Sequence, residues 1–466
     1  MSKSIKTRME KDSLGEIELP GEAYYGVQTQ RAVQNFPISG LKAHPVLVES
    51  YVFIKKAAAM TNASLGQLDK KISIAIVKAC DEILSGKHRE HFVVDVFQAG
   101  AGTSHNMNTN EVIANRAIEL LGGKKGNYKL IHPNDHVNMA QSTNDTFPTA
   151  MKLASLFMLK DLLPVIKKFE NTLSKKAREF KRIIKSGRTH LQDVAPITLG
   201  QEFSGYAGIV RKHYELISLT RTHLSELGIG GTAVGTGLNT HVGYRKLMVK
   251  NLSKITGLKL KPANNYFEAM QSMLPFTELS SSLKNFAADL TKITNDIRLL
   301  SSGPTTGFAE VILPAVQPGS SIMPGKVNPS IAEMMNQVCY QVMGYDLTVT
   351  LSSQAGQLEL NVMMPVIIYN IIMSVEILKN ALNVFDKKCL AGLKADEKKC
   401  REYAERSISI VTALNPIIGY ARAAEIAKES VKTGRSIMEV IREKNIMDEE
   451  MLNKVLDLMK LTKPGL

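Results

Sequence analysis

The sequence contains no tryptophan, and aromatic residues make up only 6% of its 466 residues. Proteins that bind single-stranded nucleic acid without sequence preference stack bases on aromatic side chains, so this scarcity argues against such a partner. The formal net charge of +14 would suit a polyanion. The lysines are spread along predicted helices rather than clustered, however. We interpret the charge as a basic surface and expect no nucleic-acid partner.

Cysteine is also scarce, with four residues, Cys80, Cys339, Cys389 and Cys400. They form no Cys-x-x-Cys pair, and none lies at a zinc-ligand spacing from a histidine. This pattern argues against a redox dithiol and a structural zinc site. We expect no metal centre and reduced thiols.

Long apolar runs are missing as well. The first residues, MSKSIKTRMEKD, contain no apolar stretch of the kind found in a signal peptide. The most apolar segment, PVIIYNIIM, is interrupted by Asn370 and is too short, by its sequence, to cross a bilayer. The expectation is a cytoplasmic protein that is neither secreted nor embedded in a membrane.

The remaining composition is that of a folded globular protein, with 44% hydrophobic and 22% charged residues. A chain of this length exceeds the size at which one hydrophobic core keeps growing, so two or three domains are expected. Turn-rich stretches and short helical patterns predict a mostly helical domain at 1–141. Long helical patterns fill 142–397, and shorter, charged patterns predict a small helical domain at 398–466. No strand-rich region is predicted.

The middle of the chain carries the strongest helical signal. Apolar residues recur at steps of three or four over 162–184 and, without a break, over 276–300, as on one face of a helix. The second run consists of Phe276, Leu279, Leu283, Phe286, Leu290, Ile293, Ile297 and Leu300. This spacing is a heptad seam, which packs against other long helices at a shallow angle. The fold class is therefore mainly α, with a long-helix bundle.

A third segment, 366–385, is apolar on more than one face and starts just after Pro365, where a helix can begin. Its apolar residues, which cannot share one stripe, are Ile367, Ile368, Ile371, Ile372, Val375, Ile377 and Leu378. A helix that is apolar nearly all round must be buried on all sides, and we expect neighbouring subunits of an oligomer to cover it.

Two short polar segments differ from packing material. GAGTSHNMNTN contains Thr103 after two glycines, and QSTND contains Ser142, Thr143, Asn144 and Asp145. Small residues let backbone amides approach an anion, and hydroxyls and amides hold a carboxylate without adding a full charge. Residues of the same kinds also form helix caps and turns. Both interpretations stay open for the first segment, and the second, taken alone, favours a cap.

A third polar segment, QPGSSIMPGKVNP, covers residues 317–329 and contains Ser320, Ser321, Lys326 and Asn328. A loop with glycine pivots can carry a base into a site and close over it. A simple turn would explain the glycines and prolines but not the paired serines together with Lys-x-Asn, so the functional interpretation is favoured. It is not a nucleotide P-loop, because Val327 follows the Gly-Lys pair.

Two further segments are weaker signals. GRTHLQDV contains Thr189 and His190, but a lone histidine is more often structural or on the surface than catalytic. The glycine-rich segment 228–237 looks like a dinucleotide fingerprint but lacks the preceding strand. We assign it to backbone packing at a helix junction.

Taken together, these segments resemble the aspartase/fumarase superfamily, whose signature is the GSSIMPGKVNP loop. The similarity runs from EKDSLGE and YYGVQTQRA near the start to LTKPG at the end. Within the superfamily, YGVQT, KGNY, QSTND and AGQLELNVM are similar to the wording of aspartases. Class II fumarases usually read WGAQT, QSSND and NGxFELNVF.

The resemblance implies a mainly α, three-domain fold whose long central helices form a bundle shared in a homotetramer, with each active site built from three chains. It implies a carbon–nitrogen lyase that converts L-aspartate, a small dicarboxylate, reversibly into fumarate and ammonia. The β-proton leaves first, through an aci-carboxylate intermediate. No organic cofactor is implied, although some aspartases are activated by divalent cations.

The resemblance also implies a role for each candidate residue. Ser320 would be the general base, activated by amides of its own loop and by Lys326, because a serine hydroxyl is too weak an acid to ionise unaided. The residues expected to bind the β-carboxylate are Thr103, Ser142, Thr143 and Ser321. Those expected to bind the α-carboxylate are Lys326, Asn328 and Thr189. Asn144 and His190 would contact the amino group or assist its departure.

Several positions depart from the family pattern. Thr305 follows SSGP where most members have arginine, and Gln354 and Met364 stand where aspartases usually have glutamate. Met270 and Met273 occupy positions that are usually polar. These departures leave room for a weakened dicarboxylate-binding paralogue. His190 with the HPNDHVN and DTFPTA segments leaves room for a class II fumarate hydratase.

Overall fold

The computed structural model describes residues 7–464. Seventeen α-helices account for most of these residues, so the predicted mainly α class is confirmed. The described strands are β1 (Thr7–Asp12), β2 (Gly15–Pro20), β3 (Ile184–Thr189), β4 (Gln192–Thr198), β5 (Glu226–Leu227), β6 (Lys261–Pro262), β7 (Val311–Ile312) and β8 (Lys394–Ala395). They form four two-stranded sheets, of which only β5–β6 is parallel. The sequence analysis did not anticipate these short pairs.

The chain divides into two compact units. The first comprises the residues up to Leu163 together with Leu216–Asn285 and Gln341–Leu378. The helices that lie wholly within it are α1 (Val27–Asn35), α2 (Pro45–Ser64), α3 (Lys70–Leu84), α4 (Thr103–Leu120), α7 (Arg221–Leu224), α8 (Tyr244–Thr256) and α9 (Tyr266–Gln271). A short 3₁₀ turn, η1 (Arg89–His91), and a π-helical turn, η2 (Pro133–Val137), also belong to it. Residues of α2, α3 and α4 form one buried apolar core.

The second unit comprises Pro164–Glu215, Phe286–Tyr340 and Lys379–Leu466. The helices that lie wholly within it are α13 (Glu397–Arg406), α14 (Asn415–Ile418), α15 (Tyr420–Thr433), α16 (Ile437–Glu443) and α17 (Glu449–Val455), with the short turns η3 (Asp386–Leu390), η4 (Ile408–Leu414) and η5 (Lys460–Thr462). A separate apolar cluster fills the space between η4, α15, α16 and α17. The three domains predicted from the sequence stay a prediction.

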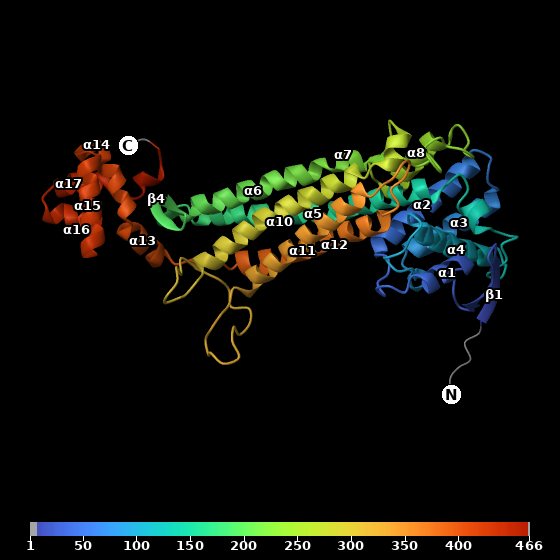
Figure 1. Cartoon of the computed structure of the whole chain (residues 1–466), viewed down its shortest axis with the longest axis horizontal. Coiled ribbons are helices and arrows are strands. Elements are labelled where there is room, and N and C mark those ends of the chain that lie inside the picture. The colour runs from blue at the N-terminus through green and yellow to red at the C-terminus, as the bar shows by residue number, and fades with distance from the viewer. Residues whose placement is uncertain (1–6, 465–466) are drawn as a thin grey trace. The chain divides into compact units, whose positions relative to one another are not determined.

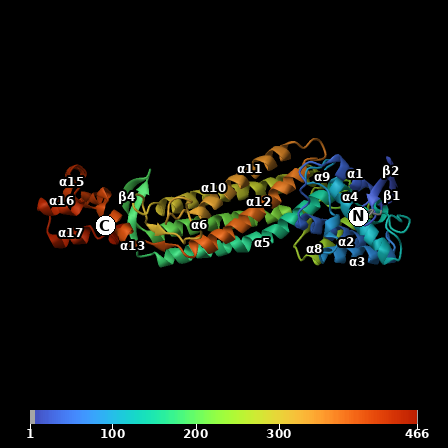
Figure 2. The ribbon, with the colours of Figure 1, turned by 90° about the horizontal axis from the view of Figure 1, so that it is seen from below.

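Five long helices contribute a segment to each unit. They are α5 (Thr143–Glu179), α6 (Leu199–Leu219), α10 (Leu274–Leu300), α11 (Ser330–Gln354) and α12 (Met364–Phe385). Figures 1 and 2 show these helices running alongside one another. The long-helix bundle inferred from periodicity is therefore present.

The heptad seam of α10 is buried as predicted. All eight of its apolar residues are at most 4% exposed. The periodic run over 162–184 is only partly a helix, because α5 ends at Glu179 and Ile184 already begins β3. Apolar residues can thus keep helical spacing beyond the end of a helix, when the strand that follows packs into the same core.

Burial within the chain accounts for α12. Six of its seven clustered apolar residues are at most 2% exposed, and only Ile377 is partly exposed. The expectation that neighbouring subunits must cover this helix was therefore wrong, because residues of the same chain bury it. The prediction that this segment is too short to cross a bilayer was wrong as well. Within the described residues, the stretch Met364–Leu390 is long and apolar enough to cross a membrane, although 61% of its most apolar window is buried, as in a core helix.

The YGVQT segment begins α1, and a buried carboxylate fixes its position. Glu111 of α4 accepts hydrogen bonds from the backbone N–H groups of Gly26, Gln28 and Thr29 at 2.8, 2.9 and 3.1 Å, and from Thr29 Oγ1 at 2.6 Å. Burial raises the pKa of Glu111 to about 7 against the opposing effect of these bonds. A motif near the start of the chain is in this way tied to α4.

The α10 seam gives a first testable prediction. Leu283→Ala should lower the free energy of unfolding by about 2–5 kcal/mol, because it leaves a cavity at a fully buried position. The matched control is Asn285→Ala on the exposed side of the same helix, which should change it by less than about 0.5 kcal/mol. Urea unfolding at equal protein concentrations measures both. Equal effects of the two substitutions would contradict the seam.

Candidate functional site

Thr103 is the first residue of α4 and lies exposed at its N-terminus. Its Oγ1 donates to the Gly100 carbonyl at 2.6 Å. The chain reaches it through three consecutive left-handed residues, with φ of 89°, 54° and 90° at Gly100, Ala101 and Gly102. A Cβ at Gly102 would overlap the ring of Phe147, so glycine lets α4 begin directly against α5.

The N-terminus of α5 carries the QSTND segment. Ser142 is its cap, because Ser142 Oγ accepts from the Asn144 N–H at 3.2 Å and the Ser142 N–H donates to Asp145 Oδ1 at 3.0 Å. The Ser142 hydroxyl thus caps the second residue of the helix, and Asp145 returns a bond to the Ser142 N–H as the acidic residue of a capping box does. The capping interpretation of this segment is confirmed, and the binding role of its hydroxyls stays a prediction. Asn144 donates from Nδ2 to the Ala233 carbonyl at 2.8 Å.

The two helix N-termini are neighbours. Asn106, in the first turn of α4, donates from Nδ2 to the Oγ1 of the buried Thr143 at 3.2 Å. The N-terminus of a helix carries partial positive charge and unpaired backbone N–H groups, which attract anions. Two such ends lined by hydroxyls form a place suited to a carboxylate. The starts of α4 and α5, which carry Thr103 and the pair Ser142 and Thr143, are therefore adjacent.

A fully buried lysine lies next to these helix ends. Lys55 Nζ of α2 donates to the side-chain carbonyl oxygens of Asn106, Asn138 and Gln141 at 2.6, 2.9 and 2.9 Å. Burial lowers the pKa of Lys55 to about 7, and the nearby Asp145 opposes this shift. Lys55 was not among the residues predicted from the sequence. Its position in the sequence could have indicated its burial. The buried apolar residues Val48, Val52 and Ala59 of α2 recur at helical spacing, and residue 55 falls on the same face.

Asp145 connects the start of α5 to the glycine-rich segment. Its Oδ2 accepts from the N–H groups of Gly230 and Thr232, both at 2.9 Å. Burial raises the pKa of Asp145 to about 7, and its backbone hydrogen bonds and Lys55 oppose this shift. The expectation that no strand precedes the glycine-rich segment was wrong, because the two-residue strand β5 ends directly before Gly228. The assignment to backbone packing rests instead on close contacts, since a Cβ at Gly230 would overlap Arg245 of α8.

Thr189 and His190 lie in the second unit, at the tip of the β3–β4 hairpin, where both are exposed. His190 and Leu191 form the two-residue turn, with φ of 53° and 59°. Hairpin turns of this kind normally use Asn or Gly, because other residues strain the backbone by about 1–2 kcal/mol each. Such strain at an exposed histidine supports a functional role.

A buried ion network holds the base of this hairpin. Arg188 Nη1 lies 3.0 Å from both oxygens of Glu310, and Lys185 Nζ lies 3.3 Å from Glu310 Oε2 and 2.8 Å from Glu202 Oε2. Glu310 is fully buried. Lys185 and Arg188 belong to β3. Their contacts with Glu310 and Glu202 therefore hold the strand that carries Thr189 in place.

The signature loop, 317–329, is closed at its base by glycine. The Gly319 N–H donates to the Lys326 carbonyl at 2.8 Å, and Asn328 Nδ2 donates to the Gly319 carbonyl at 2.8 Å. A Cβ at Gly319 would overlap the Lys326 carbonyl. Figure 1 shows the loop extending away from the helices. Ser320 and Lys326 line one open concavity of about 440 Å³, and Ser321 is exposed beside it.

Ser320 receives hydrogen bonds from its own loop, as expected. Its Oγ accepts from the N–H groups of Ile322 at 3.2 Å and Met323 at 3.0 Å. Two amide donors aimed at one hydroxyl oxygen lower the free-energy cost of forming its alkoxide. The structure therefore joins Ser320, Lys326 and Asn328 in one loop, whereas Thr189 and His190 lie on a separate hairpin.

The positions that depart from the family pattern have different surroundings. Met270, Met273 and Met364 are buried, and Met364 begins α12. Thr305 and Gln354 are exposed. The three methionines therefore pack in the core where most family members have polar residues. Thr305 and Gln354 lie at the surface.

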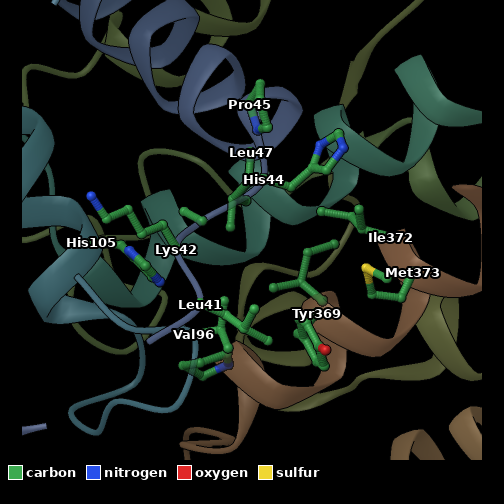
Figure 3. Close-up of a pocket in the computed structure, with 13 residues that line it drawn as sticks. Leu41, Lys42, His44, Pro45, Leu47, Val96, His105, Tyr369, Ile372 and Met373 are labelled. Atoms are coloured by element: carbon green, nitrogen blue, oxygen red, sulfur yellow. The ribbon is translucent and has the colours of Figure 1, made fainter. Parts of the chain in front are cut away.

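A separate apolar cavity of about 270 Å³ lies in the first unit. Figure 3 shows Tyr369, Ile372 and Met373 of α12 around it, with Leu41 and Val96 on the facing segments. Burial lowers the pKa of His105, which also lines it, to about 4, so this imidazole is neutral at pH 7. Lys42 and His44 also line this cavity, but most of its lining is apolar, which does not suit a dicarboxylate.

Comparison with known proteins covers nearly the whole chain. The family described as Lyase matches residues 15–344, and the family described as Fumarase C C-terminus matches 410–463. An aspartate ammonia-lyase of Bacillus sp is 51% identical over 459 residues, covering 98% of both chains. A class II fumarate hydratase of Bacillus anthracis is 45% identical over 461 residues, covering 99% of this chain and all of the relative.

A solved structure agrees. The fumarate lyase:delta crystallin of Brucella melitensis bound to cobalt has a TM-score of 0.96 and 49% identity, and the match covers 98% of this chain and 100% of that one. The matching family models, the full-length relatives and the solved structure thus indicate the same family as the motifs of the polar segments. The chain belongs to the lyase family of aspartate ammonia-lyases and class II fumarases, the aspartase/fumarase superfamily.

Proposed function

We propose that this chain is an aspartate ammonia-lyase that converts L-aspartate reversibly into fumarate and ammonia. The observation that carries the proposal is the loop 317–329, where two backbone amides point at Ser320 Oγ in the concavity that Lys326 also lines. The similarity to aspartate ammonia-lyases, at 46–51% identity over the full chain, favours ammonia over water as the group removed.

In this proposal Ser320 is the general base. Its alkoxide takes a proton from the β-carbon of L-aspartate, and the electron pair of the broken C–H bond moves onto the β-carboxylate to give the aci-carboxylate. The pair then returns to form the C–C double bond while the C–N bond breaks, and ammonia leaves with the bonding electrons. The Ser320 hydroxyl loses its proton to solvent before the next turnover. The first transfer needs donors placed where the new charge appears.

The helix ends of α4 and α5 supply those donors. We assign the β-carboxylate to the hydroxyls of Thr103, Ser142 and Thr143, with Ser321 added from the loop. These groups carry no full charge, and the positive ends of two helices and the nearby Lys55 ammonium favour the additional negative charge. The arrangement stabilises the dianion more than the ground-state carboxylate.

The remaining candidates bind the other end of the substrate. We assign the α-carboxylate to Lys326, Asn328 and Thr189. Asn144 and His190 contact the amino group, and the turn that presents His190 is held in a left-handed conformation. Closure of the loop would exclude water, so that these groups act in a low dielectric.

We further propose a homotetramer in which each active site takes residues from three chains. Support comes from α11, where Gly344, Leu347 and Leu351 form an exposed stripe at steps of three and four. Leu347 is 60% and Leu351 52% exposed. A stripe of this kind on a long helix packs well against an equivalent helix.

The other expectations remain part of this proposal. All four cysteines are free and buried, which agrees with the reducing conditions of the cytoplasm. Each step above uses side chains of the protein, so no organic cofactor is needed. A class II fumarate hydratase is the second candidate, because a relative with that name is 45% identical over the full chain.

A substrate panel tests the activity. Purified wild type should release fumarate from L-aspartate with a kcat/KM well above that for L-malate. Ser320→Ala should lower kcat by about a hundred- to ten-thousandfold, the usual contribution of a general base. Absorbance of fumarate measures both, and circular dichroism checks that the variant is folded.

The matched control is Ser85→Ala, at an exposed serine after α3, which should keep full activity. Faster turnover of L-malate would replace the proposal by the fumarase. Binding of a dicarboxylate without turnover of any substrate would indicate a weakened paralogue. A fully active Ser320→Ala would remove the assigned base.

Lys55 gives a pH-dependent prediction. In Lys55→Met, Asp145 loses a nearby positive charge that stabilises its carboxylate, so its pKa should rise above the value of about 7 in the wild type. The acidic limb of kcat/KM should then move to higher pH, and activity should fall roughly a hundredfold at neutral pH because the helix ends shift. Lys56→Met, one residue along α2 where the lysine pairs with Asp81, is the control and should leave the limb in place. An unshifted limb in Lys55→Met would contradict the coupling.

The α11 stripe predicts the assembly. Leu347→Lys with Leu351→Lys should place charges in the proposed subunit interface and shift the protein from tetramers to smaller species in light scattering coupled to size exclusion. Leu238→Lys, at a leucine that is 68% exposed outside the long helices, should stay tetrameric. A tetrameric double variant would place the interface elsewhere.

A further inference from the structure

We propose that the turn at residues 88–91 binds one divalent transition-metal ion through His88, Glu90 and His91. One ligand atom from each side chain lies within 4.8 Å of the other two. Ligand bonds of about 2.0–2.2 Å place ligand atoms roughly 3–4 Å apart around one ion. Small side-chain rotations, chiefly of Glu90, therefore bring the three atoms to bonding distance.

The backbone of this turn is already fixed. His88 is left-handed, with φ of 62°, and precedes η1, and the His91 N–H donates to the His88 carbonyl at 3.2 Å. The buried Asn108 of α4 donates from Nδ2 to the His91 carbonyl at 2.9 Å and accepts from the Val93 N–H at 3.0 Å. Both imidazoles thus project from a preorganised segment, which lowers the entropy lost on binding.

Tyr24 also restricts the two imidazoles. Its ring centroid lies 4.4 Å from that of His88 and 5.0 Å from that of His91, and its hydroxyl donates to Glu119 Oε2 at 2.7 Å. The histidine side chains are 16% and 14% exposed, whereas Glu90 is 69% exposed. An ion can therefore approach from the solvent on the Glu90 side.

Ordinary pairing explains this cluster less well. Glu82 Oε2 lies 3.6 Å from His88 Nε2, which is longer than a hydrogen bond, and Glu82 already accepts from Arg116 Nη2 at 3.0 Å. His91 Nε2 lies 3.2 Å from Glu90 Oε1. A metal ion would replace this single polar contact by three ligand bonds.

The donor set selects the class of metal. Two imidazole nitrogens and one carboxylate favour zinc, cobalt or nickel, whereas magnesium and calcium prefer oxygen ligands. Three protein ligands leave at least one position for water. The ion would brace the connection between α3 and α4 and takes no part in the chemistry proposed above.

The test uses full-length protein without a polyhistidine tag, stripped by a chelator and then dialysed. Calorimetric titration with zinc should give one ion per chain, and cobalt should develop a visible absorption spectrum with the same stoichiometry. Zinc should also raise the melting temperature, and an equal concentration of magnesium should not compete. Absence of saturable zinc binding in the wild type would overturn the proposal.

Two variants and a control locate the site. His88→Gln with His91→Gln should weaken zinc binding at least a hundredfold and abolish the cobalt spectrum. If that variant does not fold, Glu90→Gln, at an exposed side chain, should weaken binding by about tenfold. The control is His132→Gln with His136→Gln, a histidine pair beside Asp135 that should bind as the wild type does. Unchanged binding in the His88 and His91 variant would place the ion elsewhere and overturn the proposal.

Discussion

The hydrogen bonds of the buried Lys55 ammonium are the interaction on which the start of α4 and the start of α5 depend. An ammonium taken from water without partners would cost several kcal/mol, and three amide oxygens at 2.6–2.9 Å offset that cost. Those oxygens belong to Asn106, Asn138 and Gln141, which lie far from Lys55 in the sequence. Because Asn106 also donates to Thr143, the place of the ammonium and the place of that hydroxyl are set together. A shift of one moves the other.

This network also explains why uncharged groups line the two helix ends. A cation in direct contact with the β-carboxylate would already stabilise the bound substrate strongly, and the part of the stabilisation that substrate and dianion share does not raise kcat. On the proposed function, hydroxyls and helix N-termini would hold the carboxylate in place, and Lys55 would add positive potential from behind them without a direct bond. The benefit therefore grows as the second charge appears. On the proposed function, burial of Lys55 serves the reaction as well as the fold.

The sequence predicted what depends on local period and missed what depends on distant partners. The α10 seam was identified because all eight residues repeat on one face, and that face is buried. The apolar pattern of α12 correctly indicated burial, but a pattern cannot say whether its own chain or another covers it. Lys55 looked like one of many lysines, because only the fold brings Asn106, Asn138 and Gln141 to it. The hairpin of β3 and β4 was missed because Ile184 continues the helical period of α5.

The candidate residues were proposed from their chemical types and from the family resemblance, and their backbone conformations were not predictable. Ala101 precedes Thr103 by two residues, Ala140 precedes Ser142 by two, and His190 follows Thr189, and all three have positive φ without being glycine. Each of these conformations costs about 1–2 kcal/mol, which must be offset by the surrounding structure. At β3 the offset comes from Lys185 and Arg188 held by the buried Glu310. Left-handed residues beside several of the proposed substrate contacts are hard to explain by stability alone, because a relaxed turn would be more stable. Selection that retained the positions of these side chains, rather than the stability of their turns, explains the strain.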